Sequence, residues 1–476
     1  MLRRLARDTV VYTFAGSASR AFSALVLPIY ARTLTPTQLG NVDMLLMFGG
    51  IAAIAVGFEI SQGYARYHSE AQSPSDVVSL ASTAFAITIV AFSVFALVGS
   101  VTADSIARLL LRSSGQGKLV RVALAAFWTQ ALMQLLLTHL RYGLRPSRFA
   151  VVSLTSTAIS MSAACLFIWA LKTGPIGVFY GMVLGNLAGL CLGLVWSKGD
   201  IFGAFSWEKS LLMLSFSLPL VPAGLIGVVG AYIDRLSIQH FMTQADVGLF
   251  GAGFRIASVG GVALVGLQLA FVPLLYSNFK RPEAPAEIAR VFQYFVGAAA
   301  VFSITASLFA QEIARFILTV TYAKSAGVIP LLAPAVIFAN MTMFAPGLSL
   351  AKRTRQLAVV VSIGALANAA LNFAFVPLLG IRGAALSTLL SAAATFAVLL
   401  SLSQRYFAMP LRTVPLISVG FMTLIISGVA ATFDAEPSST FLIAKVVVWS
   451  AAIAVLLLTR VLDPNDFGRL RRLIRS

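Results

Sequence analysis

Charged side chains are scarce in this sequence: they make up 11% of its 476 residues, whereas 59% are hydrophobic. Soluble domains average about a quarter charged and about half apolar residues, so water is not the main solvent of this chain. Its apolar stretches of about twenty residues match the roughly 30 Å hydrocarbon core of a bilayer, because a helix rises about 1.5 Å per residue. The composition therefore predicts an all-α integral membrane protein.

Reactive side chains are also few. The two cysteines, Cys165 and Cys191, fall inside apolar stretches without metal-ligand spacing, so we interpret them as packing residues. The three histidines, His68, His139 and His240, are far apart in the sequence. No phosphate-binding glycine loop, paired-histidine metal helix or serine nucleophile elbow is present in the sequence. We therefore predict a protein that is not an enzyme and has neither cofactor nor metal.

Acidic residues are outnumbered: 17 Asp and Glu oppose 35 Lys and Arg, for a net charge of +18. Roughly two thirds of the basic residues fall in alternate loops that would share one side of the membrane with both termini. The positive-inside rule then places both termini in the cytoplasm of a cell whose inner (plasma) membrane holds the protein. Topology explains the charge, so nucleic acid is not needed as a partner, and the basic loops suit anionic membrane lipids.

Apolar runs between charged or Gly/Pro-rich breaks predict fourteen transmembrane helices. The first seven are expected near residues 9–30, 41–60, 77–101, 119–140, 149–171, 176–196 and 211–233. The second seven are expected near residues 247–277, 290–310, 327–350, 357–379, 383–402, 413–432 and 439–460.

Two sequence segments recur at nearly the same distance along the chain. Leu34–Gly40 (LTPTQLG) resembles Met242–Gly248 (MTQADVG), and Gly174–Val178 (GPIGV) resembles Gly380–Ala384 (GIRGA). Each copy would contain six helices, and because six is even, the second copy would start on the same side of the membrane as the first. The two copies would therefore be parallel lobes, with the substrate between them. We predict an N-terminal lobe at 1–205, a C-terminal lobe at 206–405, and two further helices with a basic cytoplasmic tail at 406–476.

Polar residues within spans are costly in hydrocarbon and usually face a cavity or a partner. Arg20 lies near the middle of the first predicted helix, and helical spacing places Tyr12 and Ser19 on its polar face. Arg255 is a second candidate cation in the opposite lobe. For both arginines the alternative is a structural role: backbone carbonyls or a buried acid would satisfy Arg20, and the stem of Arg255 would reach the interface.

Further candidates lie in other predicted helices. Gln130, Gln134 and Arg141 share a face that suits a sugar or headgroup, with interhelical hydrogen bonding as the alternative. Asn368 and Asn372 form a similar pair, for which packing is favoured.

The acids leave two interpretations open. Asp43 and Glu59 are candidates for ion coupling, although plain solvated acids near the interfaces are the simpler interpretation. We interpret Asp234 and Arg235 as a local ion pair that ends its helix. Lys445 is close enough to a helix end to reach water, so it receives no role.

The sequence resembles a known family in three segments. They are Asp8–Tyr12 (DTVVY), Leu27–Gly40 (LPIYARTLTPTQLG), and Asp234–Ile238 (DRLSI) followed by Asp246–Phe250 (DVGLF). In these the chain resembles the polysaccharide-biosynthesis flippases of the multidrug/oligosaccharidyl-lipid/polysaccharide exporter superfamily. The resemblance covers essentially the whole chain, and its segments are typical of the fold rather than of one substrate.

The resemblance implies a V-shaped, two-lobed transporter of the multidrug-exporter type that works by alternating access. Its implied substrate is an undecaprenyl-diphosphate-linked oligosaccharide, exported from the inner to the outer leaflet. Arg20 and Arg255 would then hold the diphosphate, and H⁺ or Na⁺ would drive transport through Asp43 or Glu59. Polysaccharide assembly enzymes are the implied partners.

Three alternatives remain open. A multidrug exporter would need a cavity dominated by carboxylates, which the intramembrane arginines argue against. A lipid II flippase shares the expected number of helices. A membrane glycosyltransferase or ligase would have to show sugar-transfer activity, and no residues for that reaction stand out in the sequence.

Overall fold

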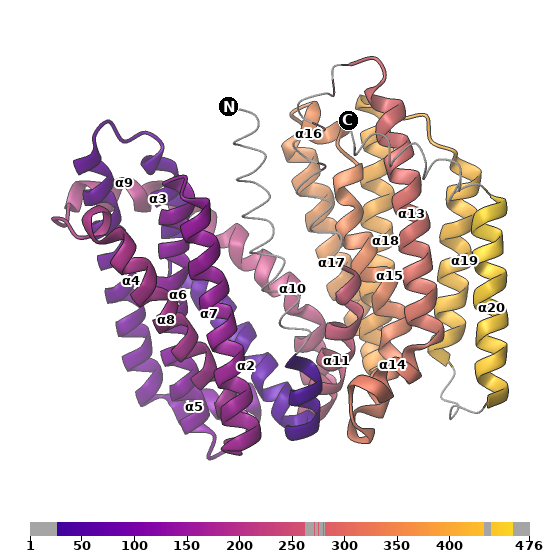
Figure 1. Ribbon diagram of the computed structural model, residues 1–476, viewed down its shortest axis with the longest axis horizontal. Coiled ribbons are helices and arrows are strands. Elements are labelled where there is room, and N and C mark those ends of the chain that lie inside the picture. The colour runs from indigo at the N-terminus through magenta and orange to yellow at the C-terminus, as the bar shows by residue number, and fades with distance from the viewer. Residues whose placement is uncertain are drawn as a thin grey trace. The chain divides into compact units, whose positions relative to one another are not determined.

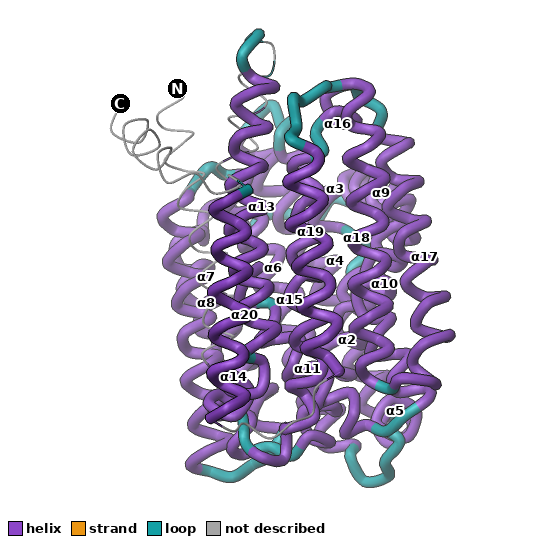
Figure 2. Tube along the Cα trace, turned by 90° about the vertical axis from the view of Figure 1, so that its right-hand side faces the viewer, coloured by secondary structure: helices purple, strands orange, loops and turns teal. Residues whose placement is uncertain are grey.

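The computed structural model describes residues 26–261, 271, 275, 279, 281–432 and 439–459, and these residues form helices without any strand (Figure 2). The chain divides into two compact units, Met1–Gly251 and Ala252–Ser476. The predicted lobe boundary at residue 205 concerns the sequence repeat and stays a prediction.

The first unit is a bundle of helices with short connections (Figure 1). Its described helices are α2 (Pro36–Ala55), α3 (Ile60–His68), α4 (Pro74–Val101), α5 (Ala103–Leu111), α6 (Gly117–Tyr142), α7 (Pro146–Cys165), α8 (Ile176–Ile201), α9 (Trp207–Ser217) and α10 (Val221–Phe241). A π-helical turn at Leu166–Ala170 extends α7, and a 3₁₀ turn at Leu218–Leu220 joins α9 to α10. Helix α11 (Gln244–Ala257) crosses from the first unit into the second.

The second unit repeats this pattern of long helices. Its described helices are α13 (Ala284–Leu308), α14 (Ala310–Ile317), α15 (Ile329–Asn340), α16 (Gly347–Leu350), α17 (Thr354–Leu379), α18 (Ile381–Tyr406), α19 (Thr413–Thr432) and α20 (Ser439–Leu458). The 3₁₀ segments Val320–Val328 and Met341–Phe344 flank α15.

Twelve helical segments within the described residues are long and apolar enough to cross a membrane. They confirm the predicted all-α membrane fold, and α19 coincides with the run predicted at 413–432. Most of the first predicted helix and the second half of the run at 247–277 lie outside the described residues. The total of fourteen helices therefore stays a prediction.

Besides α3, two short helices were missed by the sequence analysis. Helix α5 follows α4 directly, and α14 follows α13 in the same way, 207 positions later. Each has eight or nine residues and carries apolar and charged side chains on opposite faces, so neither contains the long apolar run that marks a span.

The backbone repeats itself at the offsets seen in the sequence. Leu144 and Lys352, 208 positions apart, both have positive φ angles, of 51° and 58°. Gly174 and Gly380, 206 positions apart, have φ angles of 67° and 62°. Left-handed backbone is uncommon outside glycine, so its recurrence at Leu144 and Lys352 supports the predicted repeat.

A stripe of glycines lets α8 approach its neighbours closely. Gly181 and Gly185 pack against the backbone of α7 around Ser160, and Gly189 and Gly193 pack against Met133 and Leu136 of α6; the glycines occupy every fourth position, so they share one face. In a bilayer, association depends on such close packing, because lipid is as apolar as the side chains. This stripe explains why α6, α7 and α8 lie side by side (Figure 1).

Aromatic rings fill the centre of the second unit. Phe344 is fully buried, and its ring lies 5.0 Å from that of Phe271, 5.2 Å from that of Phe292 and 4.9 Å from that of Phe295.

An ion pair joins two other helices of the second unit. Lys445 of α20 binds Glu312 of α14, with Nζ 2.7 and 3.0 Å from the two carboxylate oxygens. The sequence analysis gave Lys445 no role, and the structure gives it an ion pair with an acid of α14.

Candidate functional site

Helix α2 carries the first charged residue of the site. Its start is fixed by Thr35, whose side chain accepts a hydrogen bond from the amide of Gln38, while the Gln38 side chain accepts one from the amide of Thr35. This capping box, with Pro36 in the first turn, sets where the helix begins. Asp43 follows about two turns later, on a part of α2 that is almost wholly buried.

Asp43 is buried beside an arginine of another helix. The Asp43 side chain is 3% exposed, and its Oδ2 lies 3.8 Å from Nε of Arg235 in α10, which is 8% exposed. The interpretation of Asp43 as a solvated interfacial acid was therefore wrong, because α10 covers it. The prediction that Asp234 and Arg235 end their helix was wrong, because α10 continues to Phe241. Their local ion pair stays a prediction, and Arg235 also reaches Asp43.

Aromatic rings surround the guanidinium of Arg235. Its central carbon lies 5.2 Å from the centre of the Tyr232 ring and 5.7 Å from that of Phe250 in α11. Guanidinium groups are attracted to the faces of such rings, most strongly where water is excluded. Three further polar residues of α10 close to Arg235 in the sequence are also buried: Asp234, Ser237 and Gln239. This part of α10 is therefore unusually polar for a membrane helix.

The end of α10 is held by α5. The Gln239 amide donates a hydrogen bond to the carbonyl of Leu110. Arg112, just after α5, donates to the carbonyls of His240 and Met242, each at 3.4 Å. These contacts fix the position of α10 near Arg235, so α5 has a structural role that the sequence did not reveal.

The chain turns sharply just after the candidate membrane span of α2, which ends at Ala55. Phe58 and Glu59 both have φ angles of 50°, and the chain turns there before α3 begins at Ile60. Positive φ angles are uncommon outside glycine, and strained residues concentrate at functional positions. Glu59 is half-buried at this turn and lies beside Gly224 of α10, where an added Cβ would stand 2.9 Å from its Oε1.

Both predicted coupling acids therefore lie along one interface. Asp43 meets Arg235, Gly50 packs near Val228, and Glu59 lies beside Gly224. Residue numbers rise on one chain as they fall on the other, so α10 runs antiparallel to the α2–α3 segment. We call this interface the α2–α10 seam.

Two glycines of the repeat meet at the start of α2. A Cβ on Gly40 would overlap the carbonyl oxygen of Gln244, and a Cβ on Gly248 would overlap that of Pro36. Gln244 is the repeat counterpart of Pro36, and Gly248 that of Gly40, so the contact is symmetric. The glycines allow the first turns of α2 and α11 to touch through their backbones.

The polar face predicted on α6 is present. Gln130, Gln134 and Arg141 are all exposed, whereas Thr138 is buried and donates a hydrogen bond to the carbonyl of Gln134. Arg141 also lies over the Phe149 ring, 5.3 Å from its centre. The side chains of Gln130 and Gln134 face outward from the first unit. Among the described residues, neither side chain forms a hydrogen bond to another helix.

The other predicted candidates have mixed outcomes. The Asn372 amide donates to the carbonyl oxygen and to Oδ1 of Asn368 within α17, which favours packing. Arg255 is half-buried in the last part of α11. Tyr12, Ser19 and Arg20 lie outside the described residues, so their assignment stays a prediction.

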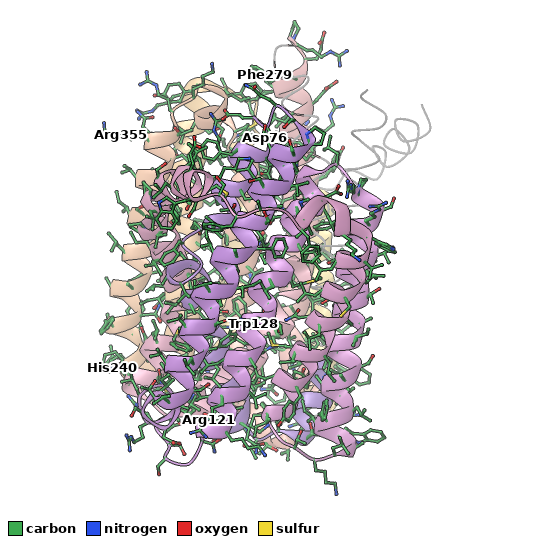
Figure 3. The ribbon with its side chains drawn as sticks, turned by 90° about the vertical axis from the view of Figure 1, so that its left-hand side faces the viewer. Asp76, Arg121, Trp128, His240, Phe279 and Arg355 are labelled. Carbon is green, nitrogen blue, oxygen red and sulfur yellow. The ribbon has the colours of Figure 1, made fainter. Side chains whose placement is uncertain are left out.

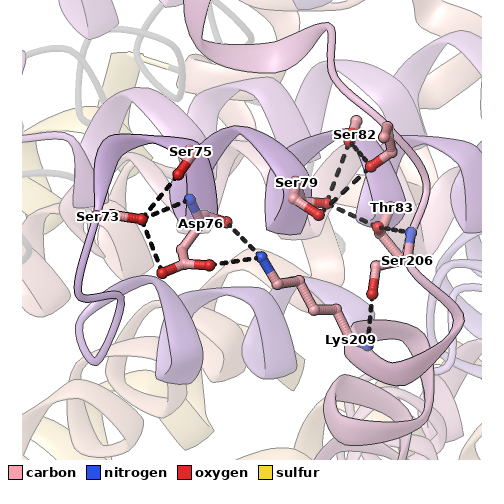
Figure 4. Close-up of polar contacts among 9 residues, drawn as sticks. Ser73, Ser75, Asp76, Ser79, Ser82, Thr83, Ser206 and Lys209 are labelled. Carbon is pink, nitrogen blue, oxygen red and sulfur yellow. Dashed lines mark hydrogen bonds and ion pairs between the residues drawn. The ribbon is translucent and has the colours of Figure 1, made fainter.

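A polar network joins the helices at one end of the first unit (Figure 4). The Lys209 ammonium binds Oδ1 of Asp76 at 3.0 Å, and Ser73 donates to the same carboxylate. Ser79 and Ser82 donate to the carbonyl of Ala204. Asp76 and Arg121 mark opposite ends of this unit, with Trp128 between them (Figure 3), so the network anchors the chain between α8 and α9 away from the middle of the spans.

Two of the three histidines meet near this end. The rings of His68 and His139 lie 6.3 Å apart, and the Tyr64 hydroxyl is 2.7 Å from Nδ1 of His139. Arg145, which pairs with Asp200, is close enough to act on His68 electrostatically. The sequence did not suggest this cluster, because α3 and α6 become neighbours only in the fold.

The protonation of His68 should make stability depend on pH. His68 lies in α3, outside the helices long enough to span a membrane, and burial together with the Arg145 guanidinium lowers its pKa. Protonation then favours the unfolded chain, so the melting temperature should fall as the pH drops below about 6.5. Melting temperatures measured at pH values from about 5 to about 8, where histidine titrates, should depend less on pH for His68→Gln than for the unchanged protein. Equal slopes for both proteins would contradict this role.

Comparisons with known proteins agree with the helical architecture. Residues 5–279 match the model of a family described as "Polysaccharide biosynthesis protein". A Haemophilus influenzae protein, "Lsg locus putative protein 1", is 30% identical over 69 residues, which cover 14% of this chain and 17% of that protein. The chain thus matches only a small part of this relative's length.

Solved structures with the same fold are transporters by their titles. A structure of the lipid II flippase MurJ has a TM-score of 0.70 at 14% identity, over 98% of this chain and 100% of that one. A multidrug resistance MATE transporter of the MOP superfamily has a TM-score of 0.64 at 17% identity, over 84% and 96%. A MOP superfamily transporter from Pyrococcus furiosus, described as having a binding pocket of reverse polarity, has a TM-score of 0.59 at 17% identity, over 85% and 95%.

Proposed function

Since this chain belongs to the polysaccharide biosynthesis protein family, we propose that it moves an undecaprenyl-diphosphate-linked oligosaccharide from the cytoplasmic to the outer leaflet by alternating access. The fold shared with MOP superfamily transporters supports transport. The oligosaccharide substrate is supported by the family description.

The exposed polar face of α6 is the observation that carries the proposal. Gln130 and Gln134 lie in the middle third of a helix that spans a membrane, yet they face away from the packed interior. Such side chains are costly against lipid, so they line a water-filled path. Amide groups both donate and accept hydrogen bonds, which suits the hydroxyls of a sugar, and Arg141 at the end of this face suits a phosphate.

Arginines would hold the diphosphate during transport. The substrate's negative charge must cross hydrocarbon, and charge-assisted hydrogen bonds to Arg20 and Arg255 would offset its desolvation. Lysine would be a weaker replacement, because only guanidinium groups bind phosphate oxygens in pairs.

Ion coupling is assigned to the α2–α10 seam. Glu59, half-buried at the turn after α2, is the better candidate for binding H⁺ or Na⁺. Asp43 already has a cationic neighbour in Arg235. We place the protein in the inner membrane with both termini in the cytoplasm, where polysaccharide assembly enzymes would supply its substrate.

Transport into proteoliposomes tests the proposal. We expect Arg20→Ala to abolish flipping of a fluorescent undecaprenyl-diphosphate oligosaccharide, and the double variant Q130A/Q134A to slow it at least about fivefold, from the loss of two hydrogen bonds at about 0.5–1.5 kcal/mol each. Val94→Ala, on the exposed apolar face of α4, is the matched control and should transport normally. Normal flux in Arg20→Ala would contradict the role of the arginine.

Other substrates in the same assay separate the alternatives. Faster flipping of lipid II than of the oligosaccharide would identify a lipid II flippase. Export of a cationic dye with no flipping of the oligosaccharide would identify a multidrug exporter. Appearance of a new glycosidic product in the liposomes would instead identify a transferase.

A further inference from the structure

One long segment of the second unit contains no acid. Between residues 313 and 433 the sequence has eight Lys and Arg and neither Asp nor Glu. Four of these cations, Lys352, Arg353, Arg355 and Arg405, belong to one end of α17 and α18. Figure 3 shows Arg355 at the same end of this unit as Phe279. Positive charge is therefore concentrated there without a neighbouring carboxylate in the sequence.

These four cations surround an open cavity of about 700 Å³. We call it the basic pocket; it is lined by Lys352, Arg353, Thr354, Arg355, Gln356, Val359, Val360, Leu402, Arg405 and Tyr406. Tyr406 donates a hydrogen bond to Gln356 at 3.3 Å, and Arg353 lies 6.0 Å from the centre of the Tyr406 ring. Within the described part of the chain, none of the four cations forms a salt bridge.

The first unit contains the same turn with its equivalent arginine paired to an acid. Arg145 and Arg353, 208 positions apart, donate equivalent backbone hydrogen bonds to Leu140 and Leu348. Arg145 pairs with Asp200, at the end of α8. At the 206-residue offset that relates α8 to α18, the counterpart of Asp200 is Tyr406. An aromatic ring thus stands where the first unit has a carboxylate, so Arg353 has no acidic partner among the described residues.

We propose that the basic pocket binds the phosphodiester headgroup of an anionic membrane phospholipid. Arginine is suited to phosphate because it donates hydrogen bonds in pairs, and basic pockets between membrane helices favour anionic headgroups. This inference does not depend on the proposed transport substrate.

The walls of the pocket favour a lipid over a soluble anion. Val359, Val360 and Leu402 line it beside the cations. Val359, Val361, Ile363 and Leu366 of α17 are about half or more exposed, so the apolar side of this helix continues from the pocket along the span. A headgroup at the cations would leave its acyl chains against this apolar surface.

Binding to the purified full-length protein tests the proposal. In neutral detergent, native mass spectrometry would follow titration with short-chain phosphatidylglycerol, with zwitterionic phosphatidylcholine, and with inorganic pyrophosphate. We expect phosphatidylglycerol to bind at least about tenfold more tightly than phosphatidylcholine, and R353Q/R355Q/R405Q to lose at least about tenfold in that affinity, given about 1 kcal/mol per cation. The matched control K118Q/K172Q/K324Q removes the same charge elsewhere and should bind normally.

A single substitution tests the electrostatic argument without removing a cation. Tyr406→Asp would place a carboxylate beside Arg353, as Asp200 stands beside Arg145, and should weaken phosphatidylglycerol binding; Tyr406→Phe should retain it. Unchanged binding in both R353Q/R355Q/R405Q and Tyr406→Asp would overturn the proposal. Pyrophosphate binding more tightly than phosphatidylglycerol would overturn the assignment to a lipid and indicate a soluble phosphate.

Discussion

Replacing Arg235 by glutamine is expected to destabilise the protein by about 3–5 kcal/mol, because it removes the positive charge 3.8 Å from the buried Asp43 carboxylate. Asp43 is 3% exposed, so water cannot take the place of the guanidinium. Unfolding in detergent, followed by circular dichroism during denaturant titration, would measure the change in free energy. Because the Asp43–Arg235 pair is buried, it is expected to contribute more to stability than a surface ion pair, which contributes about 0–1 kcal/mol.

The double variant D43N/R235Q separates the charge effect from packing. If the loss comes from removing the positive charge beside Asp43, removing both charges should recover most of the stability. Arg112→Gln is the control: its guanidinium is exposed and donates to two carbonyls at 3.4 Å, so its loss should cost less than about 1 kcal/mol. A double variant as unstable as the sum of its single variants would show that the two residues are not coupled.

The sequence predicted the helices well because hydrophobic length is a local property. The run at 413–432 coincides with α19, and that at 176–196 lies within α8. The run predicted at 41–60 ends close to Phe58 and Glu59, but the sequence predicted neither the left-handed turn there nor α3 beyond it. A left-handed backbone at such residues is set by the surrounding packing rather than by their own preference.

The site was less predictable than the fold. Polar residues inside apolar runs made Asp43, Glu59 and the α6 face candidates, because their cost in hydrocarbon is independent of neighbours. Partners were not predictable: Arg235 is 192 positions from Asp43, and Tyr406 reaches Arg353 from the next helix. One sequence contains no signal that selects one distant partner among many.

Alanine at either glycine of the α2–α11 contact is expected to destabilise the first unit by about 1–3 kcal/mol, as overpacking does. The Cβ of Gly248→Ala would overlap the carbonyl of Pro36, and that of Gly40→Ala would overlap the carbonyl of Gln244. Both obstacles are backbone atoms, so no side chain can rotate away and the helices must separate. Denaturant titration of the two single variants would measure the loss.

The symmetry of this contact makes the double variant informative. Once one added methyl group has separated α2 from α11, the second should meet less resistance, so the double variant should lose less stability than the sum of the single variants. Gly227→Ala in α10 is the matched control: an added Cβ there has no atom within 4 Å, and alanine favours a helix over glycine by up to about 1 kcal/mol. Gly227→Ala should therefore be neutral or stabilising. Full additivity, or an equal loss in the control, would show that the backbone contact between Gly40 and Gly248 does not hold these helices together.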